Sequence, residues 1–473
     1  KIPLISVRHF AYVYCQKKMT KITKIIRILS NPELRRNLPH LLRVRFYRKL
    51  IKNSGYKNSS RQAELIKKNQ IFSEFNAAEY LEKFPCRAAR IIDYTTDILK
   101  NGIELFGVNF RMDKDTDWFL DPKDSIRWAM KKYDERNVHY TGSPKDVKIV
   151  WELNRHQYLF SLSMAYRIKN DDRYAGIVID QLNSWIDSNK VGEGINWASP
   201  MEVSIRLISW ILTLDLLKDS VDYIANQKKI LQSIYEHITF LDAHLSDDRI
   251  LPTNHLIGEL SGLIIASLVY EFNDSDKIYK KSIKRLSKEL EAQVFADGVS
   301  KEQSTSYHRF VLDFLTLIVS LCKKFSIEIE NKIPAVTEAM FAYIKNCITP
   351  DGTLPMIGDG DNGRGFLITA PDNFWNMEHA LSNYTALFNQ KSSIYANEEI
   401  HEETYLLGLS SKAAPDNKSG SVDDLLKIQK FEFSGHYIIR NEKSFYMFVR
   451  SGVFGMGGEG FSSHSHFDLL SPV

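Results

Sequence analysis

Apolar residues recur at helical spacing along most of the chain, from about residue 61 to about residue 347. Residues three, four and seven positions apart lie on one face of an α-helix, so such stripes predict amphipathic helices. The clearest stripes occupy residues 151–166, 174–185 and 205–212, and others follow at 256–269, 306–321 and 335–346. Polar clusters such as Asn170-Asp171-Asp172 separate them. The pattern predicts short helices joined by tight links and stacked as hairpins, with loops and helix ends around one concave face.

The pattern changes after about residue 350. Glycine, aspartate and asparagine fill residues 358–363, which excludes a helix there, and residues 410–424 are typical of a polar linker. Apolar runs at 431–433, 437–440 and 445–449, the last two flanking Asn441-Glu442-Lys443, predict strands and a hairpin. Two or three strands do not form an independently stable sheet. We therefore expect this chain to contain only the beginning of a β-domain.

Composition and charge indicate a large globular protein. The chain has 473 residues, of which 44% are hydrophobic and 25% are charged, enough for a sizeable core. Its net charge is only +4, but residues 1–70 are strongly basic. Such a segment is typical of a solvated tail, and it also suits contact with a polyanion or an anionic membrane surface. No zinc-finger, helix-turn-helix or phosphate-loop pattern accompanies it, so nucleic acid is not an expected partner.

Other compositional features exclude more than they indicate. Aromatic residues reach 12%, which suits stacking on sugar rings and equally suits a helical core. The four cysteines are scattered and show neither metal nor redox spacing. No apolar run of about 18 residues predicts a membrane span, and no signal-peptide pattern is visible. Nothing in the composition indicates an oligomeric state.

Five polar clusters interrupt the apolar pattern, and they contain the candidate functional residues. They occupy residues 151–156, 196–202, 254–259, 297–308 and 462–468. Each has a structural explanation by itself: Asn254 and Ser304 could cap helices, and Glu202 with Arg206 forms an i,i+4 pair worth a few tenths of a kcal/mol. Together, polar side chains near successive helix starts predict one wet, concave face.

These clusters resemble a known enzyme family. Residues 151–156, 184–186 and 196–199, with Glu202 and Arg206, resemble the N-terminal toroid of heparinase II/III-type polysaccharide lyases. Asn254-His255, and residues 302–304 with Tyr307-His308, are similar to the two catalytic stretches of that family. Residues 464–468 (His-Ser-His-Phe-Asp) resemble the motif that opens its C-terminal β-domain. The resemblance covers about residues 60–473.

The resemblance implies a mainly α fold, an incomplete (α/α) toroid of helical hairpins followed by the beginning of an antiparallel β-sandwich. We expect a basic N-terminal flank at 1–60 and the toroid lyase domain at 61–350. Connecting loops and a helical segment follow at 351–430, and the start of the β-sandwich domain at 431–473. The expected partner is an acidic polysaccharide. Because such glycans lie in the cell envelope or outside the cell, a periplasmic or envelope location is expected.

The implied reaction is β-elimination on a uronic-acid-containing glycan. It requires neutralisation of the uronate carboxylate, a base for the C5 proton and an acid for the leaving oxygen. By resemblance, Asn254, His255 and His464 neutralise the carboxylate, and Tyr307 acts as base, acid or both. A basic tyrosine needs nearby positive charge, which His255, His308, His464 and the arginines could supply. The expected substrate-binding or geometry-fixing residues are Arg155, His156, Asn196, Trp197, Glu202, Arg206, Glu302 and His308, although His308 could equally be a core residue.

Three further hypotheses accompany this one. By resemblance, His466 would bind a zinc ion that organises the complete β-domain; zinc sites generally need four ligands, so His466 and Asp468 alone do not form one. A glycoside hydrolase would need two catalytic carboxylates, for which Glu152, Glu202, Asp297 and Glu302 are available. A non-catalytic glycan-binding protein or a defective fragment is the third.

Overall fold

In a computed structural model, the structure describes residues 64–112, 116–131, 147–246, 253–389, 400–409, 426–441 and 445–458, together with His464. The chain divides into two compact units, residues 1–61 with 246–252 and residues 62–245 with 253–473. All described residues except Ser246 belong to the second unit. The expected basic flank, the linker 410–424 and the proposed zinc ligand His466 lie outside the described residues.

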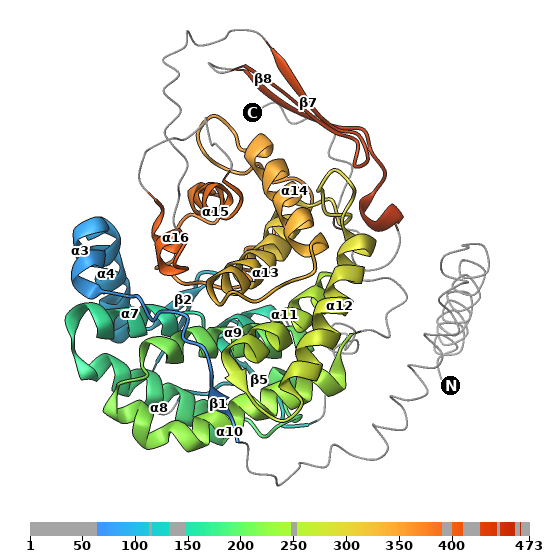
Figure 1. Ribbon diagram of the computed structural model, residues 1–473. Coiled ribbons are helices and arrows are strands. Elements are labelled where there is room, and N and C mark those ends of the chain that lie inside the picture. Colours follow the sequence, from blue (N-terminus) through green and yellow to red (C-terminus); the bar gives the residue numbers. More distant parts are fainter. Residues whose placement is uncertain are drawn as a thin grey trace, which may run out of the picture. The chain divides into compact units, whose positions relative to one another are not determined.

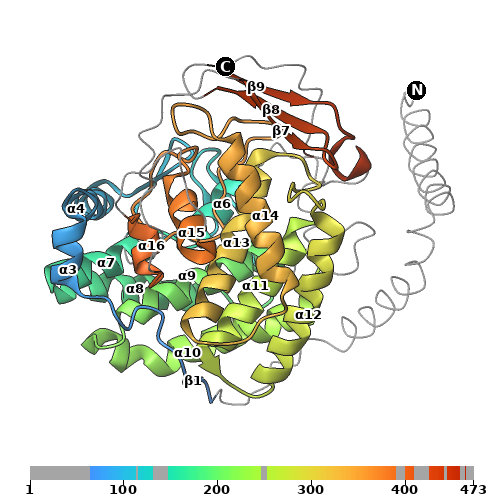
Figure 2. The same cartoon turned by 45° about the horizontal axis from the view of Figure 1, so that its top comes forward.

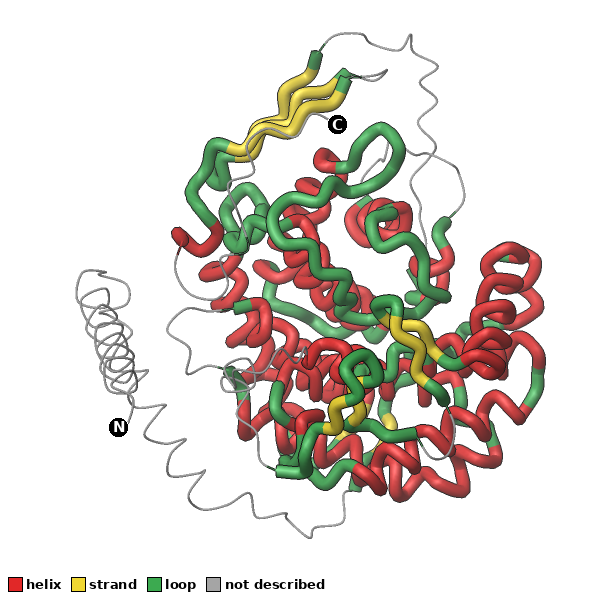
Figure 3. The backbone as a smooth tube through the Cα atoms, turned by 180° about the vertical axis from the view of Figure 1, so that it is seen from behind, coloured by secondary structure: helices red, strands yellow, loops and turns green. Residues whose placement is uncertain are grey.

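Helices dominate the second unit, as Figures 1 and 3 show. Their bounds are α3 (Ala77–Lys83), α4 (Pro85–Asn101), α6 (Val147–Asn154), α7 (Leu159–Lys169), α8 (Asp172–Ser188), α9 (Pro200–Leu216), α10 (Val221–His244), α11 (Asn254–Val269), α12 (Ser275–Gln293), α13 (Thr305–Lys324), α14 (Lys332–Cys347), α15 (Glu378–Phe388) and α16 (Glu402–Leu406). Side-chain oxygens cap several of them: Asn76 caps α3, Asp171 caps α8, Ser220 caps α10 and Ser304 caps α13. In the described part of the chain, no helix is both long and apolar enough to cross a membrane.

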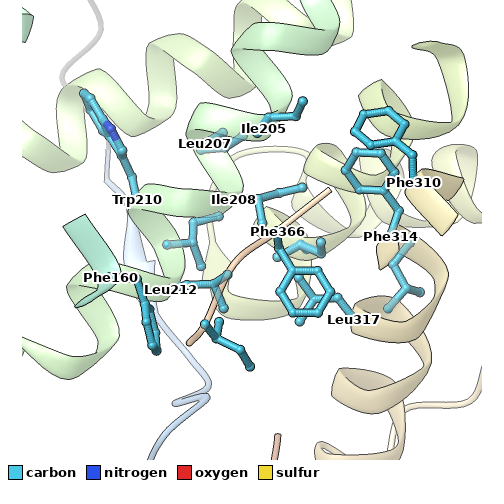
Figure 4. Packing of buried hydrophobic residues seen from close by; sticks show 14 of the residues in the cluster. Phe160, Ile205, Leu207, Ile208, Trp210, Leu212, Phe310, Phe314, Leu317 and Phe366 are labelled. Atoms are coloured by element: carbon cyan, nitrogen blue, oxygen red, sulfur yellow. The ribbon is translucent and has the colours of Figure 1, made fainter. Parts of the chain in front are cut away.

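Consecutive helices pack as hairpins, which confirms the sequence-based prediction. α7 packs on α8, α9 on α10, α11 on α12, α13 on α14 and α15 on α16. α9 is buried along its whole length and also contacts α7 and α11. The α9–α11 approach is so close that a Cβ on Gly262 would lie 2.2 Å from Ser204 Oγ. Figure 4 shows part of the core, where Ile208 of α9 and Phe314 and Leu317 of α13 lie around Phe366.

The apolar stripe at 151–166 is not one helix. α6 ends at Asn154 and α7 begins at Leu159, with His156 between them at φ +58°. A left-handed backbone at a non-glycine residue interrupts a helix, and here the buried His156 ring accepts a hydrogen bond from Trp210 Nε1 at 2.8 Å. The break between α6 and α7 therefore coincides with a hydrogen bond between His156 and α9. The spacing of apolar residues within 151–166 does not predict this break.

The strands form small antiparallel sheets. Three pairs of short strands, none of them predicted from the sequence, are β1 (Ile66–Lys67) with β6 (Tyr270–Glu271), β2 (Ile103–Leu105) with β3 (Val108–Phe110), and β4 (Leu120–Asp121) with β5 (Ile126–Arg127). The larger sheet has the order β7 (Lys427–Phe431), β8 (His436–Arg440) and β9 (Tyr446–Arg450). The predicted hairpin around residues 441–443 is the β8–β9 pair, in register from His436 with Arg450 to Arg440 with Tyr446.

Figure 2 shows this three-stranded sheet beside α14. Hydrogen bonds connect the sheet to the helical part of the unit. Tyr446 donates its hydroxyl to the carbonyl of Cys347 at 2.6 Å, and Tyr343 Oη lies 3.0 Å from His436 Nδ1. Arg450 Nε donates to Gln303 Oε1 at 3.0 Å, just before α13. A sheet of this size is stable only when it packs on something else, and α14 and the segment just before α13 provide these contacts. The expected boundaries at residues 350 and 430 remain predictions.

Candidate active site

The candidate site forms where the first turn of α13 meets the glycine-rich segment 358–363. Ser304 and Ser306 both donate hydroxyl hydrogen bonds to the carbonyl of Asp359, at 2.8 and 2.6 Å. The backbone N–H of Thr305 donates to the carbonyl of Ile357 at 3.0 Å. The segment is therefore fixed against the helix start that carries Tyr307.

His464 is held against this segment by two hydrogen bonds to one residue. Its carbonyl accepts from the backbone N–H of Asp359 at 2.8 Å, and its ring Nδ1 lies 2.9 Å from Asp359 Oδ2. Because a carboxylate only accepts, this contact assigns the ring proton to Nδ1. Gly358 permits the approach: its φ is +71°, and a Cβ there would lie 2.5 Å from the His464 carbonyl oxygen.

The His464 ring stacks on the ring of Tyr307. The ring centroids are 3.7 Å apart and the planes differ by 8°. The Tyr307 hydroxyl donates to Asp361 Oδ2 at 3.3 Å, and Lys148 Nζ donates to the same oxygen at 2.8 Å. A phenol and an imidazole, each held by its own aspartate, thus lie face to face.

Burial and the surrounding carboxylates keep Tyr307 protonated. Burial raises the pKa of Tyr307 above its ordinary value, and Asp361 and Glu302 raise it further. Burial also disfavours the charged form of Asp361, but Lys148 and Arg155 outweigh it and hold the pKa of that carboxyl below its ordinary value. The sequence led us to expect positive charges around Tyr307 that would favour its phenolate form. In this conformation the charges that act on Tyr307 are carboxylates, which favour the neutral phenol.

Asn254 and Glu302 form a second buried pair. The backbone N–H of Asn254 donates to Glu302 Oε1 at 3.1 Å, and its side-chain Nδ2 donates to both carboxylate oxygens, at 3.0 and 2.9 Å. Burial raises the pKa of Glu302, against the opposing effect of His464 and Asn254. Asn254 Oδ1 is buried without a hydrogen-bond partner among the described residues. Half-buried His255 follows on the same helix and acts electrostatically on Glu302.

Arg155 lies behind the site in an ion-pair network. Its guanidinium donates to both oxygens of Glu202, at 2.7 and 2.9 Å, and also pairs with Glu152. Glu202 therefore pairs with Arg155 and not with Arg206, the i,i+4 partner that the sequence offered. A Cβ on Gly363 would lie 3.3 Å from Arg155 Nη1, so this network supports the glycine-rich segment.

Four expected substrate-binding residues lie in the protein core instead. Arg206 is fully buried over the Trp185 ring at 4.3 Å, and it donates to His237 Nε2 at 3.0 Å and to the carbonyl of Asn196 at 3.1 Å. Burial lowers the pKa of Arg206 to about 9. The others, His156, Asn196 and Trp197, are 0–3% exposed. The structure thus places these residues where they fix the packing of α9, away from solvent.

His308 is also a core residue in this structure. Its ring accepts the N–H of Ser300 at 3.3 Å and lies 3.1 Å from the carbonyl of Met340. Burial lowers the pKa of His308 to about 4, so the ring is neutral near pH 7 and supplies no positive charge to Tyr307.

The carboxylates considered for hydrolysis all have partners. Glu152 and Glu202 bind Arg155, and Glu302 binds Asn254. Asp297 accepts from the backbone N–H of Ser434 at 3.0 Å. These contacts do not single out an acid/base pair. Within the described ranges, no three His, Cys, Asp or Glu side chains gather where they could hold a metal ion.

Sequence reasoning missed three residues of the site: Lys148, Asp359 and Asp361. The available signal was the density of aspartates in the run Gly358-Asp359-Gly360-Asp361-Asn362-Gly363, which indicated only the absence of a helix. A loop that combines glycines with charged residues can approach a helix end closely and present its carboxylates there. Nothing in the sequence marks Lys148 beyond its place in α6.

Comparisons with known proteins identify relatives of this chain. The family model described as Heparinase II/III N-terminus matches residues 46–386. A heparin-sulfate lyase of Pedobacter heparinus is 27% identical over 224 residues, which is 46% of this chain and 33% of the relative. A heparin-sulfate lyase of Bacteroides thetaiotaomicron is 29% identical over 204 residues, 41% of this chain and 28% of the relative. A third, from Bacteroides stercoris, is 25% identical over 324 residues, 63% of this chain and 44% of the relative. The matches thus span less than half the length of these curated relatives.

Solved structures show the same fold. The crystal structure of a heparan sulfate lyase from Pedobacter heparinus superposes with a TM-score of 0.50 at 21% identity, over 80% of this chain and 56% of that chain. A heparinase III gene product superposes with a TM-score of 0.51 at 19% identity, over 92% of this chain and 62% of that chain. At this level of identity the superpositions establish the toroid fold and not the substrate.

Proposed function

The chain belongs to the heparinase II/III N-terminus family, and from this premise we propose that it is a polysaccharide lyase cleaving a uronic-acid-containing glycan by β-elimination. The observation that carries the proposal is the stacked pair of Tyr307 and His464, each held by a separate aspartate. Elimination needs one group that takes a proton and one that gives a proton, close together. A neutral phenol beside an imidazole meets that need.

Tyr307 is proposed as the general acid. Burial and Asp361 raise its pKa, so it enters the reaction with its proton, and the hydroxyl is already directed by its hydrogen bond to Asp361. In the reaction the bond between C4 and the glycosidic oxygen breaks, and that oxygen takes the Tyr307 proton. The phenolate left beside Asp361 is unfavourable, which favours its rapid reprotonation.

His464 is proposed as the base that takes the C5 proton. Asp359 holds the proton on Nδ1, which leaves Nε2 as the nitrogen that can accept another. The C5–H electron pair then forms the new C4–C5 double bond. Because the imidazole N–H lies in the plane of its ring, which is parallel to the phenol ring, the proton gained by His464 returns to Tyr307 through water. A Tyr307 that served as both base and acid would instead need a phenolate, which the neighbouring carboxylates disfavour.

Asn254 and His255 are proposed to bind the uronate carboxylate. The amide of Asn254 donates to both carboxylate oxygens of Glu302 in this structure, and the substrate carboxylate is proposed to take over one of these donors while Glu302 keeps the other. Glu302 is proposed to fix the amide, and Arg155 with Glu202 to support the glycine-rich segment. The substrate class proposed first is the heparan-type glycans, after the names of the similar lyases, with other uronates as alternatives.

The product of the reaction tests the proposal. Elimination creates an unsaturated uronate that absorbs in the ultraviolet, whereas hydrolysis creates only new reducing ends. The chain is incubated with heparan sulfate and with a panel of other uronate polysaccharides, and absorbance and reducing ends are followed together. A rise of both signals with one glycan supports the lyase and identifies its substrate class. New reducing ends without absorbance would replace it with a hydrolase, and saturable binding with neither product would indicate a glycan-binding protein.

A further inference from the structure

Helix α12 exposes a row of lysines that shares no residue with the site around Tyr307. Figures 1 and 2 show this helix at the edge of the helical unit, where it packs on α11 and α14. Its larger apolar side chains, such as Ile283, Leu286 and Leu290, are buried. The opposite side of the helix carries five exposed lysines, here called the α12 lysine stripe: Lys277, Lys280, Lys281, Lys284 and Lys288.

The period of the α-helix brings these five lysines onto one face. At 3.6 residues per turn they fall within an arc of about 100°, and the stripe is about 16 Å long. Lysines three and four residues apart on a helix repel one another. On α3, by contrast, exposed Lys83 pairs with Glu79 one turn away, at 2.7 Å. The α12 lysine stripe is therefore a local concentration of one sign of charge, which is unfavourable for the helix by itself.

Four of the five lysines form no ion pair with any residue that the structure describes. The fifth, Lys281, pairs with Asp242 of α10 at 2.8 Å. Two acids of α12 itself, Glu289 and Glu291, already have other cationic partners. The third acid, Asp276, lies in the first turn, where it complements the positive end of the helix. The exposed positive charge of the stripe is thus available to a partner of opposite charge.

The stripe ends close to the segment that carries part of the candidate active site. α12 ends at Gln293, and the chain continues to Glu302 and Ser304 just before α13. Lys301, next to Glu302, donates from its ammonium group to the carbonyl of Glu291 at 3.2 Å. A basic residue therefore connects the C-terminal end of α12 with the segment before α13.

We propose that the α12 lysine stripe binds an acidic polysaccharide outside the cleavage site and holds long chains near that site. The choice of partner rests on the proposed function. A linear polyanion fits an extended row of like charges, because its acidic groups follow one another along the row. An anionic membrane fits less well, since helices that lie on membranes insert exposed apolar side chains, whereas the larger apolar side chains of α12 pack against the rest of the unit.

Equilibrium binding tests the surface without turnover. Long chains of heparan sulfate and of alginate are titrated into the full chain carrying Tyr307→Phe, so that bound polysaccharide stays intact. The triple variant Lys277→Gln, Lys284→Gln, Lys288→Gln should weaken binding about fivefold at low ionic strength, as expected for three weak surface contacts. Added salt should reduce this difference, because it screens exposed charges. The matched control replaces three exposed lysines on α4, α7 and α10 by glutamine: Lys100, Lys169 and Lys228.

The length of the substrate provides a second readout. In the enzyme with Tyr307 intact, the stripe variant should raise KM about fivefold for the long glycan that is cleaved and leave kcat unchanged, as loss of uniform binding does. A tetrasaccharide of the same glycan, bound across the cleavage site, has no length left to reach the stripe. Its kcat/KM should therefore be equal in wild type and in both triple variants. Both variants should also keep the Tm of wild type, since the replaced lysines are exposed.

Each outcome decides between the alternatives. Equal weakening in both triple variants would show that only net charge matters and would overturn the proposal, as would unchanged binding of both glycans. A stronger dependence on the stripe for duplex DNA or for phosphatidylglycerol vesicles, titrated in the same way, would overturn the choice of partner. Stripe-dependent binding without an unsaturated product would retain the surface and reject the lyase. Product formation without dependence on the stripe would retain the lyase and reject the surface.

Discussion

The rings of Tyr307, on α13, and His464 stack with their centroids 3.7 Å apart, although the two residues are far apart in the chain. The contact depends on Asp359 and Asp361, which reach the pair from the glycine-rich segment after α14. The Tyr307–His464 pair, the Arg155–Glu202 ion pair behind it and the buried carboxyl of Glu402 each lead to measurable consequences.

Tyr307→Phe should abolish most activity without unfolding the protein. The change removes the proposed acid but keeps the ring that stacks on His464. General acid catalysis typically contributes about 100-fold or more, so kcat should fall by at least that factor while Tm changes little. Tyr235→Phe, on α10, is the control. Full product formation by Tyr307→Phe would remove Tyr307 from the mechanism.

Asp361→Asn should move the pH profile. The variant keeps an oxygen that can accept from the Tyr307 hydroxyl but removes the negative charge that raises the pKa of Tyr307. The pKa of Tyr307 therefore falls, and the alkaline limb of kcat/KM, where the acid loses its proton, should move to lower pH. Rates measured across the alkaline range check this. The exposed Asp180→Asn serves as the control, and an unmoved limb would show that Tyr307 is not the acid titrating there.

Gly358→Ala should damage the site through His464. A Cβ at this position would lie 2.5 Å from the His464 carbonyl oxygen. Gly107→Ala is the matched control. Gly107 has a φ of +72° and Gly358 a φ of +71°, but nothing lies within 4 Å of a Cβ added at Gly107. In both variants an alanine adopts a left-handed backbone conformation, which costs about 1 kcal/mol. This strain should therefore lower the free energy of unfolding by a similar amount in both. Only Gly358→Ala should lose activity, and equal activities would show that the position of His464 does not matter.

Glu202→Gln should destabilise the fold. It weakens a buried bidentate contact, because Arg155 donates to both Glu202 oxygens, and it leaves Glu152 as the ion-pair partner of Arg155. Loss of a hydrogen bond between charged groups typically destabilises by about 1.5–3 kcal/mol. Glu193→Gln breaks a more exposed pair with Lys190 and should change stability by about 0–1 kcal/mol. Urea unfolding of both variants measures the difference, and similar values would show that the Arg155 network contributes little.

Glu402 should make stability fall as pH rises. Burial raises the pKa of Glu402 from 4.5 to about 7, and Tyr80 donates a hydrogen bond to it. Because the folded state favours the neutral acid, its contribution is complete below pH 4.5 and is lost progressively up to about pH 7. Over that window wild type should lose roughly 3 kcal/mol relative to Glu402→Gln. Urea unfolding at the two ends checks this, with the exposed Glu378→Gln as control; parallel pH curves for wild type and Glu402→Gln would contradict it.

The sequence by itself determined the helical class and much of the hairpin order. The period of apolar residues is a local property, so stripes such as 205–212 and 306–321 mark helices α9 and α13 wherever they pack. The same holds for the β8–β9 hairpin around residues 441–443. The family motifs, which are also local, indicate Tyr307, Asn254 and His464 as candidate site residues.

Only the tertiary structure decided which of these polar residues meet. The sequence predicted an ion pair between Glu202 and Arg206, but Glu202 forms its ion pair with Arg155. Arg206 lies in the core, over the ring of Trp185. The sequence did not mark Asp361 as a functional residue, yet its carboxylate accepts a hydrogen bond from the Tyr307 hydroxyl. The physical reason is that periodicity and motifs act over a few residues, whereas charge pairing and burial depend on how helices and loops from distant parts of the chain pack together.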